Sequence, residues 1–201
     1  MADQLARIAV FISGGGSNLQ ALIDASKNGR LCGAIVLVVS SNESAYGLER
    51  AAKAGIATFV YLPKQYPSKE DAAADLLARL RSEQIDYIAL AGYLKMLPGA
   101  VVRAYPKRIV NIHPALLPKY GGKGMYGHFV HEAVLAARDK ESGVTIHVVD
   151  EIYDHGAILE QVRVPVLDTD TPDTLAARVL VEEHKLYPRA LDKLIKGEYR
   201  L

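Results

Sequence analysis

The fold is decided near the start of the chain, by the stretch Arg7-Ile8-Ala9-Val10-Phe11-Ile12-Ser13-Gly14-Gly15-Gly16. Its apolar residues form an unbroken run, which is typical of a strand buried on both faces of a parallel sheet. Three glycines end the run. Ser17 or Asn18 is then expected to cap a helix that Asn28-Gly29 closes. The stretch therefore predicts the first strand, turn and helix of an α/β domain.

The same alternation continues along the chain. Apolar runs and helical spacing predict strands at 34–39, 57–61, 86–90 and 108–111, and helices at 44–54 and from Ser68 onward. This order implies a mostly parallel twisted sheet with helices on both faces. After a helix at about 128–138, two β-rich runs at 143–149 and 157–164 indicate an antiparallel or mixed edge. The final helix is expected to start at Thr171-Pro172 and to be kinked or divided at Pro188.

Length and composition indicate a single globular domain, residues 1–201. Half of the residues are apolar and the formal net charge is +1, so nothing favours a nucleic-acid partner. No apolar run approaches the roughly 20 residues of a membrane span. The opening segment MADQLARIAVFI lacks the charge order of a signal peptide, and the lone Cys32 fits a reducing compartment. We therefore expect a cytoplasmic protein.

The glycine loop Ser13–Asn18 lies where a phosphate is expected to bind. Its backbone N–H groups and the helix N-terminus that follows favour an anion. A tight turn without any ligand is the alternative. The dinucleotide fingerprint needs a glycine where Leu19 stands and an acidic residue where Ser40-Ser41-Asn42 stands, and the triphosphate loop needs Gly-Lys-Ser/Thr. A monophosphate is therefore the better ligand.

A second motif, Asn111-Ile112-His113-Pro114, follows the apolar pair Ile109-Val110 at the end of a predicted strand. Strand side chains alternate, so Asn111 and His113 share one face. Pro114 restricts His113 to extended geometry. An amide donor beside a group that titrates near neutrality suits a reaction in which an oxyanion develops and a proton moves.

Asp154 lies in a segment that is expected to return to the same edge of the sheet. If it reaches His113, it raises the pKa of the imidazole; alternatively it is an ordinary turn residue. His147 is as well explained by a structural role as by a catalytic one. We assign no metal, because the remaining histidines show no ligand spacing with a cysteine or carboxylate cluster: His128, His131, His155 and His184.

Motifs along nearly the whole chain carry a resemblance to a known family. They are Ile12–Ala21, Gly47–Ala51, Leu90–Leu97, Asn111–Tyr120, Gly143–Glu151, Asp154 with Gly156, and Glu183–Pro188. The chain resembles the phosphoribosylglycinamide formyltransferases of the folate-dependent formyltransferase superfamily. The resemblance implies transfer of a formyl group from 10-formyltetrahydrofolate, a co-substrate, to the amine of phosphoribosylglycinamide in purine biosynthesis.

The resemblance also implies residue roles. In the catalytic group, Asn111 and His113 would stabilise the oxyanion, and Asp154 would keep His113 protonated. The substrate phosphate and ribonucleotide would be held by Gly16, Ser17, Asn18 and Glu183. The folate pocket would include Lys69, Leu94, Lys95, Met96, Leu97 and Asn111. The half up to about residue 105 would bind phosphate, and the half from about residue 106 would carry folate and catalytic elements.

Two departures from the family pattern stand out. The loop Gly121–Gly127 is longer and richer in glycine than usual, and it is either a lid that brings Lys123 to the substrate or a surface loop of a subfamily. Lys69 and Lys95 stand where the family commonly has arginine, and lysine lacks the planar fork of a bidentate carboxylate contact.

Three alternative functions stay open. A formyltetrahydrofolate hydrolase is expected to carry an additional N-terminal domain, and a methionyl-tRNA formyltransferase an additional C-terminal one. A phosphometabolite-binding module without catalysis is the third, and the joint presence of Asn111, His113 and Asp154 argues against it. The expected partners are small molecules, with no nucleic acid and no membrane, and the expected assembly is a monomer or homodimer.

Overall fold

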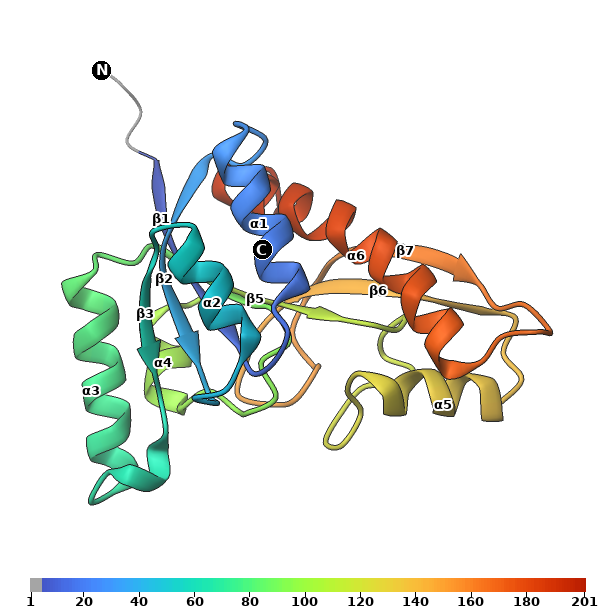
Figure 1. Ribbon diagram of the computed structural model, residues 1–201, viewed down its shortest axis with the longest axis horizontal. Coiled ribbons are helices and arrows are strands. Elements are labelled where there is room, and N and C mark those ends of the chain that lie inside the picture. The colour runs from blue at the N-terminus through green and yellow to red at the C-terminus, as the bar shows by residue number, and fades with distance from the viewer. Residues whose placement is uncertain (1–4) are drawn as a thin grey trace.

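The computed structural model describes residues 5–201 (Figure 1). The first four residues of the segment compared above with a signal peptide lie outside this range. The strands are β1 (Ala6–Ile12), β2 (Gly33–Ser40), β3 (Ala57–Val60), β4 (Tyr87–Leu90), β5 (Ile109–His113), β6 (Glu141–Val148) and β7 (Ile158–Pro165). The helices are α1 (Ser17–Lys27), α2 (Tyr46–Lys53), α3 (Lys69–Ser82), α4 (Gly99–Ala104), α5 (His128–Ala136) and α6 (Pro172–Ile195), with a 3-10 turn η1 (Pro63–Gln65). None of the described helices combines the length and apolar character needed to cross a membrane.

All seven strands join one sheet in the order β3-β2-β1-β4-β5-β6-β7. The first five in this order run parallel, whereas β6 is antiparallel to both β5 and β7. The expected α/β class and the expected mixed edge in the C-terminal half are therefore confirmed. Because the sheet is continuous, the carboxyl ends of β1, β4 and β5 open on the same edge, where ligands of such sheets bind.

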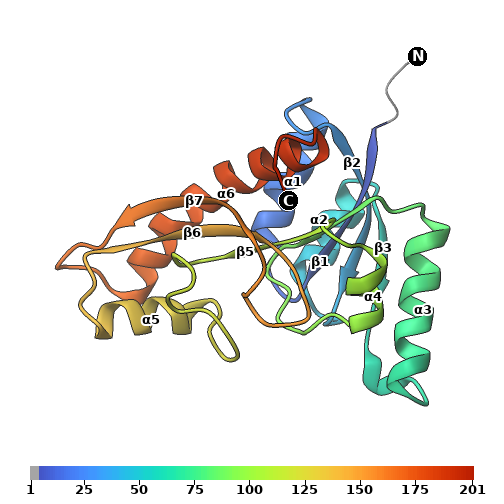
Figure 2. The same ribbon diagram turned by 180° about the vertical axis from the view of Figure 1, so that it is seen from behind.

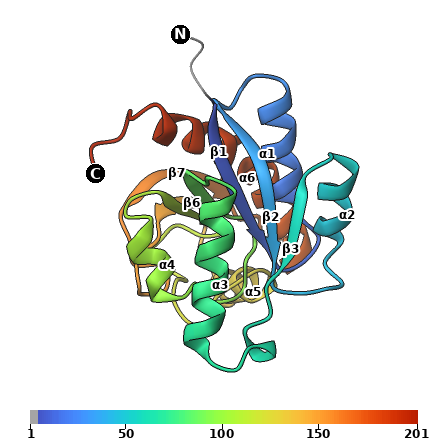
Figure 3. The same cartoon turned by 90° about the vertical axis from the view of Figure 1, so that its left-hand side faces the viewer.

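Helices cover both faces of the sheet (Figure 3). Ile8 and Val10 of β1 point to the core that α1, α5 and α6 close. Ala9 and Phe11 alternate with them and point to the core that α3 and α4 close. This alternation explains the continuous apolar run in the sequence, since each side of β1 packs against a separate helical layer.

Two local expectations were wrong. Neither Ser17 nor Asn18 caps α1: the cap residue is Gly16, with φ 70°, and no side chain bonds the first turn. Of the two outcomes expected at Pro188, a division of the last helix is wrong, because α6 runs unbroken from Pro172 to Ile195; a kink there stays a prediction. Leu186 and Tyr187 before the proline and Ala190 and Leu191 after it are all buried in the core, so packing holds the helix together across the missing N–H.

Candidate active site

A cavity of about 470 Å³ opens at the carboxyl ends of β4 and β5. One wall is the segment 92–97 that follows β4, and the other is formed by the loop 122–127 and by residues 147–154 between β6 and β7. Figure 2 shows the β6–β7 loop descending beside the segment that follows β4. Asn111–Pro114, Asn18 and Glu183 also line the cavity. The motifs from distant parts of the sequence thus meet around one space.

Asn111 and His147 face each other across the antiparallel strands β5 and β6. The Asn111 Nδ2 lies 3.1 Å from the His147 Nε2, and the His147 Nδ1 lies 2.9 Å from the carbonyl oxygen of Val148. A carbonyl oxygen can only accept, so His147 Nδ1 donates to it, and Nε2 is left facing the Asn111 amide and Asp154. His147 therefore orients Asn111.

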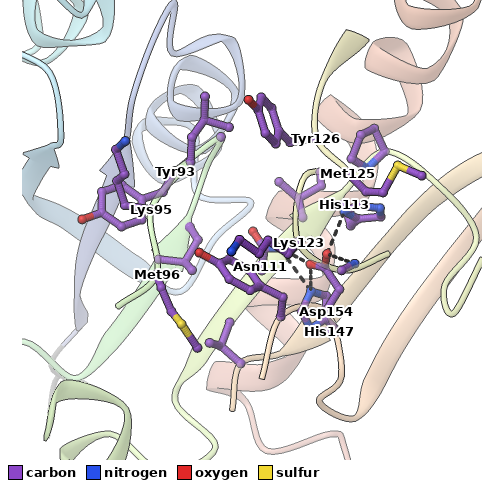
Figure 4. A pocket seen from close by; sticks show the side chains of 18 of the residues that line it. Tyr93, Lys95, Met96, Asn111, His113, Lys123, Met125, Tyr126, His147 and Asp154 are labelled. Carbon is purple, nitrogen blue, oxygen red and sulfur yellow. Dashed lines mark hydrogen bonds and ion pairs between the residues drawn. The ribbon is translucent and has the colours of Figure 1, made fainter. Parts of the chain in front are cut away.

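Asp154 comes to the same place from the β6–β7 loop, as Figure 4 shows. Its side chain is 10% exposed, and its Oδ2 accepts a hydrogen bond of 2.9 Å from the backbone N–H of Gly122. Gly156 permits the tight return of this loop, because a Cβ there would collide with the carbonyl of Val148. Asp154 Oδ1 lies 3.4 Å from Asn111 Nδ2 and 3.5 Å from His147 Nε2.

His113 is 3% exposed and has two different neighbours for its ring nitrogens. Nε2 lies 2.7 Å from the carbonyl oxygen of Tyr120, and Nδ1 lies 3.7 Å from Asp154 Oδ2. Burial lowers the pKa of His113 below its ordinary 6.5, although the Asp154 charge and the Tyr120 carbonyl both act to raise it. Asp154 thus acts on the pKa of His113 in the expected direction, but desolvation of the charged ring is the larger effect.

The Asp154 carboxyl is ionised at neutral pH. Burial acts to raise its pKa, but the polar contact with His147, the His113 charge and the Gly122 N–H together lower the pKa below its ordinary 3.8. The site thus pairs a fixed negative charge with a histidine whose charged form burial disfavours.

Asn18 and Glu183, which also line the cavity, form a buried pair. Asn18 Nδ2 donates to Glu183 Oε2 over 2.6 Å, and burial raises the pKa of Glu183. The Asn18 Oδ1 is buried without a hydrogen-bond partner among the described residues. Gly16 and Ser17 do not line the cavity; they lie beside it at the start of α1, whose first-turn N–H groups have no side-chain cap.

The residues expected to bind folate separate into two groups. Leu94, Lys95, Met96 and Leu97 line the cavity, and Figure 4 shows Lys95 and Met96 on the wall opposite His113. Lys69 does not line it, because it is the exposed first residue of α3. Lys123, Met125 and Tyr126 of the glycine-rich loop also line the cavity. This loop is therefore part of the site rather than a remote surface loop.

Comparison with known proteins gives the family. Residues 6–191 match the family model described as formyl transferase. The chain belongs to the formyl transferase family. The chloroplastic phosphoribosylglycinamide formyltransferase of Arabidopsis thaliana is 48% identical over 182 residues, which are 90% of this chain and 62% of that protein. This chain therefore spans about three fifths of the length of the plant relative.

Two further members of the formyl transferase family match over most of both chains. The phosphoribosylglycinamide formyltransferase of Escherichia coli (strain K12) is 38% identical over 96% of this chain and 89% of that protein. The crystal structure of glycinamide ribonucleotide transformylase 1 from Symbiobacterium toebii is 40% identical, with a TM-score of 0.92 over 98% of this chain and 91% of that one. The resemblance stated from the motifs is confirmed.

No definite role was predicted from the sequence for two residues at or near this site, His147 and Arg50. His147 was left open, although its pairing with Asn111 follows once β6 is placed beside β5. Arg50 was quoted in a motif without a role. Its Nε donates over 2.8 Å to the carbonyl of Gly15, which holds a positive charge against the glycine loop. A lone arginine on a helix gives no sequence signal for such a contact.

Proposed function

We propose that the chain transfers the formyl group of 10-formyltetrahydrofolate to the amine of phosphoribosylglycinamide. The observation that carries this proposal is the convergence of Asn111, His113 and Asp154 at one end of a cavity with an apolar wall. Attack of an amine on a formyl carbon forms a tetrahedral oxyanion, and such a centre needs hydrogen-bond donors and a group that moves a proton.

Asn111 keeps one N–H, and His113 keeps its Nδ1, without a close partner in the free protein; Nδ1 becomes a donor once the ring has taken up a proton. The second N–H of Asn111 has only a 3.4 Å contact to Asp154, and the His113 Nδ1 lies 3.7 Å from the same carboxylate. A contact of that length is not a strong hydrogen bond. Both positions are therefore available to an oxygen that gains negative charge, which is where preorganised donors are most effective.

His113 is also the group that moves the proton, because burial lowers its pKa and so favours the ring form that can accept one. A neutral ring accepts at Nδ1 the proton that the attacking amine loses, because Nε2 is occupied by Tyr120. The resulting imidazolium lies beside Asp154 and the oxyanion, and both charges stabilise it. It then donates the proton to the leaving nitrogen of the folate as the intermediate collapses.

The same proposal assigns the two ends of the cavity. The uncapped start of α1 with Gly16, Ser17 and Asn18 would bind the phosphate, and Glu183 would contact the ribonucleotide. The folate would lie between the exposed apolar side chains of the two walls, Leu94 and Met96 on one and Tyr126 on the other, beside Lys95. Three expectations stay predictions: the division of the chain at about residue 105, the monomer or homodimer state, and the cytoplasmic location.

One experiment separates the candidate functions. The protein is incubated with 10-formyltetrahydrofolate, with and without phosphoribosylglycinamide, and loss of the formyl group from folate is followed. Transfer requires turnover that depends on the ribonucleotide and yields its formylated amine. Turnover without the ribonucleotide would instead indicate a hydrolase, and binding of both ligands without turnover would indicate a binding module.

A further inference from the structure

The Tyr120 carbonyl that contacts His113 belongs to a residue in an unusual backbone conformation. Tyr120 has φ 56°, in the left-handed region that disfavours a residue with a Cβ. Such a conformation persists only where the surroundings hold it. The contacts of Tyr120 therefore reveal what fixes the position of its carbonyl.

The side chain of Tyr120 is held from outside the cavity. Its hydroxyl donates to Asp139 Oδ2 over 2.7 Å, and Lys119 Nζ donates to the same oxygen over 2.7 Å. These two hydrogen bonds lower the pKa of Asp139, and burial together with the bond to Asp139 raises the pKa of Tyr120 to about 12. Asp139 does not line the active-site cavity; it faces a second hollow of about 380 Å³ behind Tyr120.

The beginning of the same loop is held as firmly as its end. Thr145 Oγ1 donates to the carbonyl of Ala115 over 2.6 Å and accepts from the N–H of Leu117 over 3.1 Å. Gln161 Nε2 donates to the carbonyl of Leu117 over 2.9 Å. The loop from Ala115 to Tyr120 is thus fixed to β6 and β7 at one end and to Asp139 at the other.

The carbonyl held in this way determines which nitrogen of His113 carries its proton. Because a carbonyl oxygen only accepts, Nε2 keeps its proton in both the neutral and the charged ring, and exchange is confined to Nδ1. Nδ1 faces Asp154, and the other charged or titratable groups near the ring are His147 of β6 and His131 of α5. Two residues later, the N–H of Gly122 donates to Asp154, so the loop aligns both members of the pair.

We propose that Asp139 is a positioning residue: through the Tyr120 hydroxyl it holds the Tyr120 carbonyl on His113 Nε2, so that His113 exchanges protons with substrate and Asp154 only through Nδ1. The inference rests on the proposed function for its effect on turnover, although the state of the ring is measurable without any substrate. A free carbonyl would let the ring adopt the other neutral tautomer, whose Nδ1 proton blocks the position that must accept.

The test uses the variants Tyr120→Phe and Asp139→Asn, with Glu141→Gln as matched control, because Glu141 lines the same hollow but pairs with Arg163. Nitrogen NMR of histidine-labelled protein reports the His113 tautomer in the absence of substrates, and thermal unfolding reports stability. The wild type and the control are expected to show His113 with the proton on Nε2 alone. Both test variants are expected to show a mixture.

Kinetics supply the second readout. In both test variants kcat should fall about tenfold or more, as expected when a reacting group is misplaced. The KM for each substrate should stay within about twofold, because the binding ends of the cavity are untouched. The double variant should lose no more than either single variant, since the two residues act as one unit. A Tyr120→Phe protein that keeps the Nε2 proton and the wild-type pH profile of kcat would overturn the inference, as would loss of activity accompanied only by a lower unfolding temperature.

The two proposals fail in different ways. If the wild type shows no formyl transfer but Tyr120→Phe still shifts the His113 tautomer, the proposed function is wrong and the positioning role stands. If formyl transfer is normal but Tyr120→Phe does not shift the tautomer, the proposed function stands and the positioning role is wrong.

Discussion

His113 and Asp154 lie 3.7 Å apart, measured from Nδ1 to Oδ2, in a region where both side chains are nearly inaccessible to water. The separation is too long for a strong hydrogen bond but short enough for the charge on one group to stabilise the charge on the other. Asp154 therefore acts on His113 mainly through its charge. This relationship can be tested by removing that charge alone.

We expect Asp154→Asn to lower the pKa of His113 further. Burial already places this pKa below 6.5, and the Asp154 charge opposes burial. Asparagine keeps the size of the side chain while removing the charge. The measurement is an NMR titration of His113 in the two proteins, with Asp150→Asn, which affects a carboxylate paired with the exposed His155, as control. An unchanged or higher pKa of His113 would show that the carboxylate has no electrostatic role.

Removing either oxyanion donor should reduce the rate of the chemical step. For Asn111→Ala and His113→Ala, we expect kcat to fall roughly 100-fold or more, the usual cost of one such donor. The KM for the ribonucleotide should change little, because the proposed ribonucleotide contacts Asn18 and Glu183 are intact. Steady-state kinetics and thermal unfolding of the same samples provide the check. A kcat near that of the wild type in His113→Ala would remove His113 from the mechanism.

Lys69 and Lys95, the two lysines at positions where the resemblance suggests arginine, should behave differently. Lys95 lines the cavity, whereas Lys69 is exposed at the start of α3 and does not line it. We expect Lys95→Ala to raise the KM for the formyl-folate co-substrate several-fold, in the range of the about 1 kcal/mol that an exposed charge contact contributes. Lys69→Ala is the control and should leave this KM unchanged. Equal effects of both changes would contradict the assignment.

Gly16→Ala should weaken both the fold and phosphate binding. Gly16 has φ 70°, and an added Cβ would lie 2.8 Å from the Cα of Gly47. We expect a loss of about 1–3 kcal/mol in the free energy of unfolding, from backbone strain and overpacking, and a higher KM for the ribonucleotide. Gly15→Ala is the matched control, because a Cβ there meets nothing within 4 Å. Urea denaturation and substrate titration measure the two effects.

The stability of the fold should rise with pH between about 5 and 6.5. Burial lowers the pKa of His113, His131 and His184 below 6.5, so the unfolded chain binds more protons in this range and folding is opposed by acid. Glu183 gives the opposite slope above 4.5, because burial raises its pKa. The free energy of unfolding in urea, compared at pH 5.5 and 7, should therefore depend less on pH in His131→Gln. An identical dependence in that variant would exclude His131 as a source.

The sequence was sufficient for the parts of the fold that depend on local pattern. The apolar run of β1 and the glycines after it follow from burial on both faces of a parallel sheet, so strand and turn are readable without tertiary information. The division expected at Pro188 was wrong because tertiary packing, rather than the local pattern, decides the structure at this position. Local propensity favours a break there, but the core contacts of Tyr187 and Leu191 outweigh it.

The sequence alone predicts the site residues whose type indicates their chemistry, such as Asn111 and His113. The pairing of Asn111 with His147 depends on the register between β5 and β6, and 36 positions separate the two residues in the chain. The lowered pKa of His113 depends on its burial, which no motif encodes. The role of Asp139 could not be predicted from the sequence either, because its contact with Tyr120 exists only after α5 has packed beside the loop.

Tyr187 of α6 lies far from the catalytic strands in the sequence, yet its hydroxyl is within 2.9 Å of the carbonyl oxygen of Leu90 and 3.1 Å of that of Val110. Leu90 is the last residue of β4, before the cavity wall, and Val110 directly precedes Asn111 in β5. The ends of β4 and β5 therefore receive a shared cross-link only after the ribosome has added residue 187. The complete reaction centre therefore requires nearly the whole chain, although its catalytic residues lie between positions 111 and 154.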